Sequence, residues 1–300
     1  MRVFVTGASG HIGSLVVGEL LDAGHEVTGL ARSAAAEEIV RSAGARVLRG
    51  SLQDPEVLAA AAAAADGVIH LAFIHDFTEY AAAGATDLAA IETIGAALAG
   101  STKPFVTTSG TAMLAFGRRG ALGTEDSVVD PDGPRVASER ATIGLAANGV
   151  RSAVIRLAPT VHGPTDRRGF VPTLIANARR TGRSLYIGEG ANRWPAVHNL
   201  DAARLYRLAL ESAPAGTVLH GAAEEGIEFR LIAAAIGDLL GVPTVSVTAE
   251  QATDELGFVG TIAALDNPTS SAFTRTLLGW RPERAGLIED LSAGHYTEVG

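Results

Sequence analysis

The sequence predicts an α/β fold in which helices cover both faces of a doubly wound parallel sheet. Short apolar, strand-like runs alternate with helical patterns, and a glycine-rich turn joins the first run to the first helix. At 300 residues the chain is long enough to bury an ample core. The predicted strands occupy residues 3–5, 27–30, 46–48, 68–73, 105–108 and 154–157.

Three glycines follow the first strand with the spacing G-x-x-G-x-x-G, in the stretch Gly7-Ala8-Ser9-Gly10-His11-Ile12-Gly13. We expect Gly7 to permit the tight turn, and Gly10 to let the backbone approach phosphates. Gly13 would let the next helix, residues 14–23, pack on the strand, with the phosphates at its N-terminus. Because a strand and a helix flank the glycines, the stretch predicts a dinucleotide diphosphate site. The alternative is a tight turn without a ligand.

Capping residues mark the later elements. Asp54-Pro55 is typical of a helix start, and Asn148-Gly149 of a helix stop before the next strand. After Pro159 the alternation breaks, which indicates a smaller lobe over the nucleotide. We expect helices at 171–180, 201–211 and 228–240, a strand at 218–220 and then an irregular tail. The predicted domains are a nucleotide-binding domain of residues 1–158 plus about 194–221, and a substrate-binding lobe of about 159–193 and 222–300.

Composition excludes several kinds of protein. Lysine and arginine number 24 against 33 aspartates and glutamates, and the net charge of −9 argues against nucleic acid as a partner. The absence of cysteine excludes disulfides and thiolate nucleophiles. The longest apolar run, 57–65, is too short to cross a bilayer, and the early first strand leaves no room for a signal peptide. We therefore expect a soluble cytoplasmic protein; a homodimer is one open alternative for its assembly.

Six motifs, spread over nearly the whole chain, resemble those of the extended and atypical short-chain dehydrogenase/reductases, the group related to NAD-dependent epimerases and dehydratases. They are Thr6-Gly7-Ala8-Ser9-Gly10-His11-Ile12-Gly13, His70-Leu71-Ala72, Thr107-Thr108-Ser109, Arg156-Leu157-Ala158-Pro159-Thr160-Val161-His162-Gly163-Pro164, Trp194-Pro195-Ala196-Val197-His198-Asn199-Leu200-Asp201 and Leu278-Gly279-Trp280-Arg281-Pro282. The resemblance implies a Rossmann-type domain with a smaller C-terminal substrate lobe.

The end of the second strand favours NADP over NAD. NAD enzymes usually place an acidic residue there, but this chain has Leu30-Ala31-Arg32-Ser33, and Arg32 and Ser33 suit a 2′-phosphate. Relatives carry Gly-Asp-Leu after the third strand, where this chain has Gly50-Ser51-Leu52. The resemblance implies further cofactor contacts from the turn and from later strand ends. They are Ser9, His11, Ile12, Ser51, Leu52, Leu71, Ala72, Phe73, Thr107, Pro159 and Val161.

The chain has no match for the family's usual Tyr-x-x-x-Lys pair. Its four tyrosines, Tyr80, Tyr186, Tyr206 and Tyr296, are followed four residues later by Gly84, Gly190, Leu210 and Gly300, and its only lysine is Lys103. The resemblance places Arg135 and Glu139 at the two positions. A guanidinium keeps its proton near neutral pH, so Arg135 could stabilise an alkoxide but not act as a general acid. We expect Arg135 and Glu139 to form an ion pair along one helix.

The other candidate catalytic groups are a serine and two histidines. The resemblance puts Ser109 at the position of the family's catalytic serine, where it could donate a hydrogen bond to a substrate oxygen; Thr111 is a weaker second donor. His75 and His162 have a suitable pKa for proton transfer, and the alternative for each is a structural role. We expect His70 to be structural. The histidine spacing predicts no metal site.

Aromatic and apolar residues in the lobe and after the fourth strand form the expected substrate wall, or else the core of the lobe: Phe73, Phe77, Met113, Phe170, Tyr186 and Trp194. They indicate a fairly apolar small molecule. Arg167 and Arg168 could meet an anionic group but are more typical of solvated loop residues.

Three functions remain open. The first is an NADP-dependent oxidoreductase that moves hydride to or from a carbonyl or an imine, with Ser109 orienting the acceptor. The second is an epimerase or dehydratase that keeps its nicotinamide bound. The third is an NADP-sensing protein without turnover.

Overall fold

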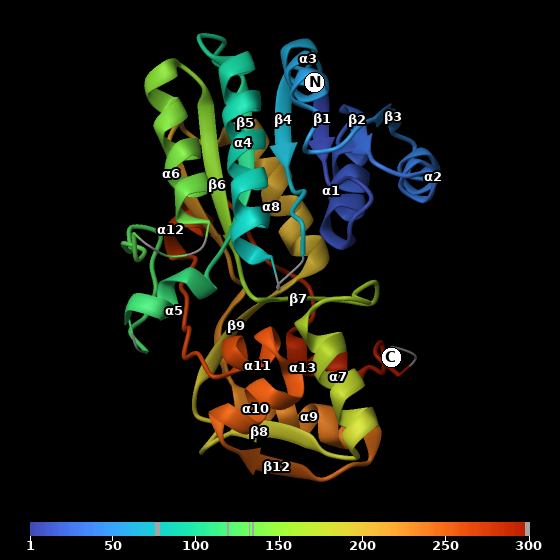
Figure 1. Cartoon of the computed structure of the whole chain (residues 1–300), viewed down its shortest axis with the longest axis vertical. Coiled ribbons are helices and arrows are strands. Elements are labelled where there is room, and N and C mark those ends of the chain that lie inside the picture. Colours follow the sequence, from blue (N-terminus) through green and yellow to red (C-terminus); the bar gives the residue numbers. More distant parts are fainter. Residues whose placement is uncertain (76–78, 119, 132, 134, 298–300) are drawn as a thin grey trace.

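A seven-stranded parallel sheet forms the centre of the larger domain (Figure 1). The structure is a computed structural model of the chain, and it describes every residue except 76–78, 119, 132, 134 and 298–300. Along the sheet the strand order is β10-β6-β5-β4-β1-β2-β3, and each neighbouring pair runs parallel. The strands are β1 (Arg2–Thr6), β2 (Glu26–Ala31), β3 (Arg46–Arg49), β4 (Gly67–His70), β5 (Pro104–Gly110), β6 (Arg151–Leu157) and β10 (Thr217–Gly221). The predicted α/β fold class is confirmed.

Helices cover both faces of this sheet. Helices α1 and α8 pack together on one face, and α3, α4 and α6 pack together on the other. Along β1, Val3 and Val5 enter the first of these cores, and Phe4 enters the second, because alternate side chains point to opposite faces. The helices are α1 (His11–Asp22), α2 (Ala34–Ser42), α3 (Pro55–Ala64), α4 (Tyr80–Leu98), α6 (Val136–Gly144), α8 (Asn199–Ser212) and a short 3-10 turn, η1 (Leu145–Asn148).

The order of strands reverses between β1 and β4. From β1 the chain first moves outward to β2 and β3, and then returns to β4 on the other side. In open α/β sheets, ligands bind outside the carboxyl ends of the strands at such a reversal. The glycine turn after β1 and the residues after β4 both lie there.

The smaller lobe is built on two further sheets. A three-stranded sheet has the order β11-β9-β7, and β8 pairs in parallel with β12. Trp194 and Phe229, whose ring centroids lie 4.9 Å apart, belong to its core. The strands are β7 (Thr160–His162), β8 (Ser184–Ile187), β9 (Arg193–His198), β11 (Glu224–Glu228) and β12 (Thr244–Val247). The remaining helices are α5 (Ala112–Arg118), α7 (Phe170–Thr181), α9 (Phe229–Leu240), α10 (Ala249–Leu256), α11 (Phe258–Ala263), α12 (Ala272–Leu278) and α13 (Leu287–Ser292).

The expectation of an irregular tail is wrong. Up to residue 297, where the described chain ends, four helices and one strand follow α9, but the helices have only six to eight residues, too few to show a clear helical period. One signal was present: Thr248 and Gln251 form a capping box at the start of α10.

The boundaries between the two domains differ from the predicted ones in two places. β9 joins the lobe's sheet because it pairs with β7 and β11. In the opposite sense, Trp280 returns to the core of the nucleotide domain and donates from Nε1 to the Asp201 carbonyl at 3.0 Å.

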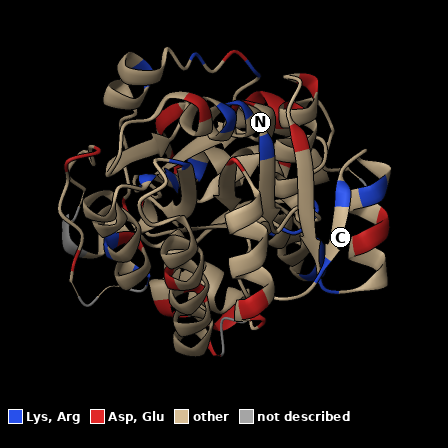
Figure 2. Ribbon diagram, turned by 90° about the horizontal axis from the view of Figure 1, so that it is seen from above, with Lys and Arg blue, Asp and Glu red and all other residues tan. Residues whose placement is uncertain are grey.

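Helix α4 is long and apolar enough to cross a membrane by length and composition alone. Its buried side packs against α3 and α6, as the core helix of a globular domain does. Charged residues of both signs are interspersed over the outer helices (Figure 2).

Candidate functional site

The three glycines of the turn are required for different reasons. Gly7 has a φ of +70°, and a Cβ there would lie 2.7 Å from the Ala72 nitrogen. A Cβ on Gly13 would lie 1.9 Å from the Gly7 carbonyl oxygen, so only glycine lets α1 pack this closely. A Cβ on Gly10 would meet only that oxygen, at 3.1 Å. The fold itself therefore needs Gly7 and Gly13, and Gly10 leaves space where phosphates would approach.

The residues around the turn fit a nicotinamide dinucleotide. Helix α1 begins with no side-chain cap and no acidic residue in its first turn, so its first amides can meet a diphosphate. His11 lies within hydrogen-bond distance of the Val161 carbonyl, with 3.2 Å from Nε2 to the oxygen, which places Val161 near the turn. Pro159 precedes Val161 by two residues. Ser9 lies in the turn itself, and Ile12 packs partly into the core.

Arg32 follows β2 and is exposed. Among the residues that the structure describes, none forms a hydrogen bond or ion pair with its guanidinium. Ser33 caps α2 by accepting from the Ala36 nitrogen at 3.2 Å, which leaves its hydroxyl proton free to donate. Both side chains are thus available to an anion at the end of β2.

Ser51 and Leu52 follow β3. The Ser51 hydroxyl donates to Asp54 at 2.9 Å and accepts from the Gln53 nitrogen at 3.2 Å, so it is engaged within its own turn. Leu52 packs against the core between the sheet and α3. After β4, the Leu71 nitrogen donates to the Thr6 carbonyl at 3.2 Å and the Ala72 nitrogen donates to the Thr6 hydroxyl at 3.3 Å. Leu71 and Ala72 therefore lie against the glycine turn.

Ser109 lies near the carboxyl end of β5. Its side chain is buried, and among the described residues its hydroxyl bonds to the Met113 sulfur at 3.8 Å. Sulfur is a weak acceptor, so the hydroxyl can turn to a better one. The Thr107 side chain contacts α6, where its hydroxyl lies 3.1 Å from that of Thr142. Thr111 is fully buried and accepts from Asn267 at 3.0 Å.

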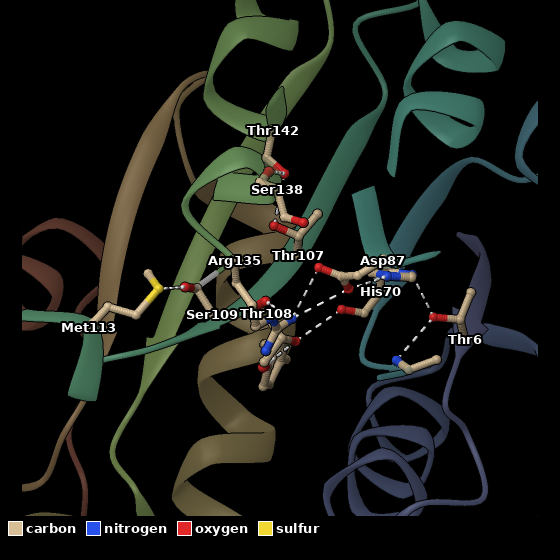
Figure 3. A network of polar contacts seen from close by, with 12 residues as sticks. Thr6, His70, Asp87, Thr107, Thr108, Ser109, Met113, Arg135, Ser138 and Thr142 are labelled. Carbon is tan, nitrogen blue, oxygen red and sulfur yellow. Dashed lines mark hydrogen bonds and ion pairs between the residues drawn. The ribbon is translucent and has the colours of Figure 1, made fainter. Parts of the chain in front are cut away.

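Arg135 belongs to a polar network that joins β4, β5 and α4 (Figure 3). Its Nη2 donates to the Thr108 carbonyl at 2.7 Å and lies 3.4 Å from both carboxylate oxygens of Asp87. The guanidinium carbon also lies 4.1 Å from the centre of the Phe73 ring. The network places a cation at the end of β5, two strands from the glycine turn.

The expected ion pair between Arg135 and Glu139 is wrong. Arg135 precedes α6 as its N-cap residue, with a left-handed φ of +64°, so its side chain turns toward β5 instead of running along the helix. Glu139 is buried and bonds to Arg156 of β6, with 3.0 Å between Arg156 Nε and Glu139 Oε2. A buried carboxylate needs a fully engaged partner, and Arg156 provides one.

The two candidate histidines lie in different surroundings. His75 is exposed, and its ring centroid lies 5.4 Å from that of Phe73. Partial desolvation of the ring, and then the nearby charge of Arg135, lower the pKa of His75. His162 is fully buried at the end of β7, 2.6 Å from Asp290 through Nδ1, and its ring stands edge-on to His198 at 5.5 Å.

His70 is buried between Thr6 and Asp87, at 2.8 and 3.2 Å, which supports a structural role. Within the described part of the chain, no group of three or more His, Asp or Glu side chains is arranged to hold a metal ion.

The expected substrate wall divides in two. Phe73 and Met113 lie at the end of the large sheet, near Arg135 and Ser109. Trp194 is fully buried in the lobe core, and Phe170 and Tyr186 pack partly against that core. Phe77 lies outside the described residues. Arg167 and Arg168 are exposed.

Sequence reasoning missed Asp87 and Phe258. Phe258 stacks on Tyr80 with 5.8 Å between ring centroids and so joins the lobe to α4. For Asp87 a signal existed, because helical spacing places it on the same face as Ala83, Ala90, Ile91 and Ile94. A lone carboxylate in an apolar stripe requires a buried partner.

The glycine turn, the strand reversal and the polar strand ends together define a dinucleotide-binding α/β protein of the short-chain dehydrogenase/reductase type. The model of the NAD dependent epimerase/dehydratase family matches residues 3–220, and the chain belongs to this family.

Relatives and solved structures agree with that assignment. An uncharacterised protein of Schizosaccharomyces pombe is 48% identical over 99% of this chain and 100% of its own length. A 2-alkyl-3-oxoalkanoate reductase of Stenotrophomonas maltophilia is 30% identical over 74% of this chain and 69% of its own. Among solved structures, a dTDP-glucose 4,6-dehydratase of Streptomyces venezuelae with NAD bound matches the fold with a TM-score of 0.78. It is 21% identical, with 99% of this chain and 97% of that chain covered. The protein therefore has the fold of a nicotinamide-dinucleotide-dependent oxidoreductase.

Proposed function

We propose that the protein is an NADP-dependent oxidoreductase that transfers hydride to or from the carbonyl, or imine, carbon of a small, fairly apolar molecule. The observation that carries this proposal is that Arg135 bonds to the carbonyl of Thr108, the residue before Ser109, at the end of β5. A hydrogen-bond donor and a cation at that place suit an oxygen that gains negative charge during reduction.

NADP is supported over NAD by the end of β2. A 2′-phosphate needs cationic and hydroxyl donors, and Arg32 and Ser33 are both available there. A 2′-hydroxyl would instead favour a carboxylate, which residues 30–33 do not contain. When bound, the nicotinamide would supply or accept the hydride.

The chain's own residues would orient the acceptor and manage its charge. The Ser109 hydroxyl would donate to the carbonyl oxygen, and Arg135 would oppose the charge that develops on it. In the reduction, the carbon gains the hydride and the oxygen gains a proton from His75 or from water. Phe73 and Met113 would meet the apolar part of the molecule. The similarity to a reductase that acts on a 3-oxo compound supports carbonyl chemistry.

The test is NADPH consumption with a panel of ketones, aldehydes and cyclic imines, followed by absorbance. Net oxidation of NADPH with a member of the panel is the expected result. Cofactor that copurifies without net redox change would favour an epimerase or dehydratase instead. Tight NADP binding with no turnover on the whole panel would favour a sensing protein.

A further inference from the structure

Arg135 is held in a backbone conformation that side chains rarely adopt. Within the described ranges only Thr102 and Arg135 combine a side chain with a positive φ, and the left-handed region costs such residues ~1–2 kcal/mol. Strain of this kind persists where the surrounding structure fixes it, often at ligand-binding sites. Here it directs the guanidinium to the Thr108 carbonyl and the Phe73 ring.

Asp87 supplies the charge that faces this guanidinium. It lies on α4 and is fully buried, with Arg135 on one side and His70 Nε2, at 3.2 Å, on the other. Burial raises the pKa of Asp87, but the hydrogen bond from His70 and the charge of Arg135 outweigh it and hold the pKa below its ordinary value. Asp87 is therefore ionised at neutral pH.

His70 makes two side-chain hydrogen bonds, one from Nε2 to Asp87 at 3.2 Å and one between Nδ1 and the Thr6 hydroxyl at 2.8 Å. One ring proton satisfies both, with Nε2 donating to Asp87 and Nδ1 accepting from Thr6, whose hydroxyl itself accepts from the Ala72 nitrogen. In this arrangement of protons, the charged groups of the network are one cation and one anion, Arg135 and Asp87. The pair has no net charge, and Arg135, whose side chain is 14% exposed while that of Asp87 is fully buried, is the member that an acceptor oxygen can reach.

We propose that Asp87 is a specificity-determining residue that, by cancelling the charge of Arg135, makes the site select uncharged carbonyl compounds over 2-oxo acids. This inference rests on the proposed function, because it takes Ser109 and Arg135 as the acceptor site. A carboxylate beside the already paired Arg135 would lose its hydration without gaining an uncompensated cation. An uncharged ketone loses less on entry between Phe73 and Met113.

The experiment compares the kcat/KM values with NADPH of two phenyl ketones, acetophenone and phenylglyoxylate, in which a methyl group of the first is replaced by a carboxylate in the second. We expect the protein to prefer acetophenone by about tenfold or more. Asp87→Asn keeps the shape but frees the charge of Arg135, and should shift the ratio toward phenylglyoxylate by about tenfold. Arg135→Gln leaves the negative charge of Asp87 uncompensated and should shift the ratio further toward acetophenone. Asp238→Asn, at an exposed position on α9, should leave the ratio unchanged.

A preference of the unmodified protein for phenylglyoxylate, or an unchanged ratio in Asp87→Asn, would overturn the inference. If Asp87→Asn fails to fold, the Arg135→Gln variant provides the test: a shift of the ratio toward acetophenone supports the inference, and a shift toward phenylglyoxylate refutes it. If neither ketone is reduced, calorimetric titration of each ketone into the NADP-loaded protein tests the charge selection separately from the proposed oxidoreductase activity. Tighter binding of acetophenone then supports the charge selection although turnover fails, and tighter binding of phenylglyoxylate refutes it.

Discussion

Glu139 is bonded to Arg156, 17 residues further along the chain, and both side chains are buried. The glutamate occupies the position that the resemblance assigns to a catalytic lysine, yet it ties α6 to β6 and does not face Arg135. Its role in the structure is therefore to compensate a buried cation.

Glu139→Gln should destabilise the protein. Removing one partner of a buried ion pair leaves an uncompensated charge, at a cost of ~3–5 kcal/mol. Thermal denaturation followed by circular dichroism measures the change, and Glu250→Gln, at an exposed position in α10, is the matched control. Equal melting temperatures for the two variants would contradict the structural role.

Arg32→Ala should weaken NADPH binding much more than NADH binding. Loss of a charge-assisted contact to the 2′-phosphate corresponds to about a tenfold to hundredfold rise in Kd for NADPH. Fluorescence titration with each cofactor gives both constants, and Arg41→Ala, at the far end of α2, serves as the control. Equal losses for NADPH and NADH would show that Arg32 does not contact the 2′-phosphate.

Gly10→Ala and Gly13→Ala should separate cofactor binding from folding. At Gly13 a methyl group would strike the Gly7 carbonyl oxygen at 1.9 Å, so the melting temperature should fall sharply. At Gly10 the nearest atom is 3.1 Å away, so stability should change little while NADPH affinity falls. Gly18→Ala, where nothing lies within 4 Å, should stabilise α1 by ~1 kcal/mol. Normal NADPH binding by the Gly10→Ala protein would show that the phosphates do not bind at this turn.

Ser109→Ala should lower kcat by about tenfold to hundredfold while the Kd for NADPH stays nearly constant, because the lost hydrogen bond forms to the acceptor. Steady-state kinetics and cofactor titration give the two values. Ser212→Ala, at the exposed end of α8, is the control. Full activity in Ser109→Ala would mean that the acceptor binds elsewhere.

Reduction should slow as pH rises if His75 gives the proton. Its pKa lies below 6.5, so the protonated fraction, and with it kcat, should increase as pH falls through that lowered value. His75→Asn should flatten this part of the pH profile, and His25→Asn, which lies before β2, should not. An unchanged profile in His75→Asn would assign the proton to water or to another group.

Much of the fold could be predicted from the sequence because its signals are local. The glycine spacing, the apolar strands and the Asn148-Gly149 stop each follow from the preferences of a few adjacent residues. The predicted strand at 68–73 ends at His70, since Leu71 and Ala72 bond back to Thr6 at the glycine turn. That ending depends on a contact between distant segments, which a local pattern does not contain.

The site was less predictable for the same reason. Arg135 and Glu139 have the spacing of a helical ion pair, but each found a closer partner on another element, Asp87 and Arg156. A sequence pattern shows which residues need a partner, but the partner comes from the packing of α4, α6 and the strands. The positive φ of Arg135 likewise follows from its surroundings. An arginine in a sequence, unlike a glycine, does not indicate a positive φ.

The return of Trp280 to the first domain limits how this architecture can be divided. A chain that stopped after β10 would contain every strand of the large sheet, yet α8 would lose the indole that covers it. Exposing such a buried aromatic site costs ~3–5 kcal/mol in other proteins. A chimaera in which the smaller lobe is replaced by that of another protein therefore has to retain residues 272–280 with the nucleotide domain. These residues lie far from the rest of that domain in the sequence.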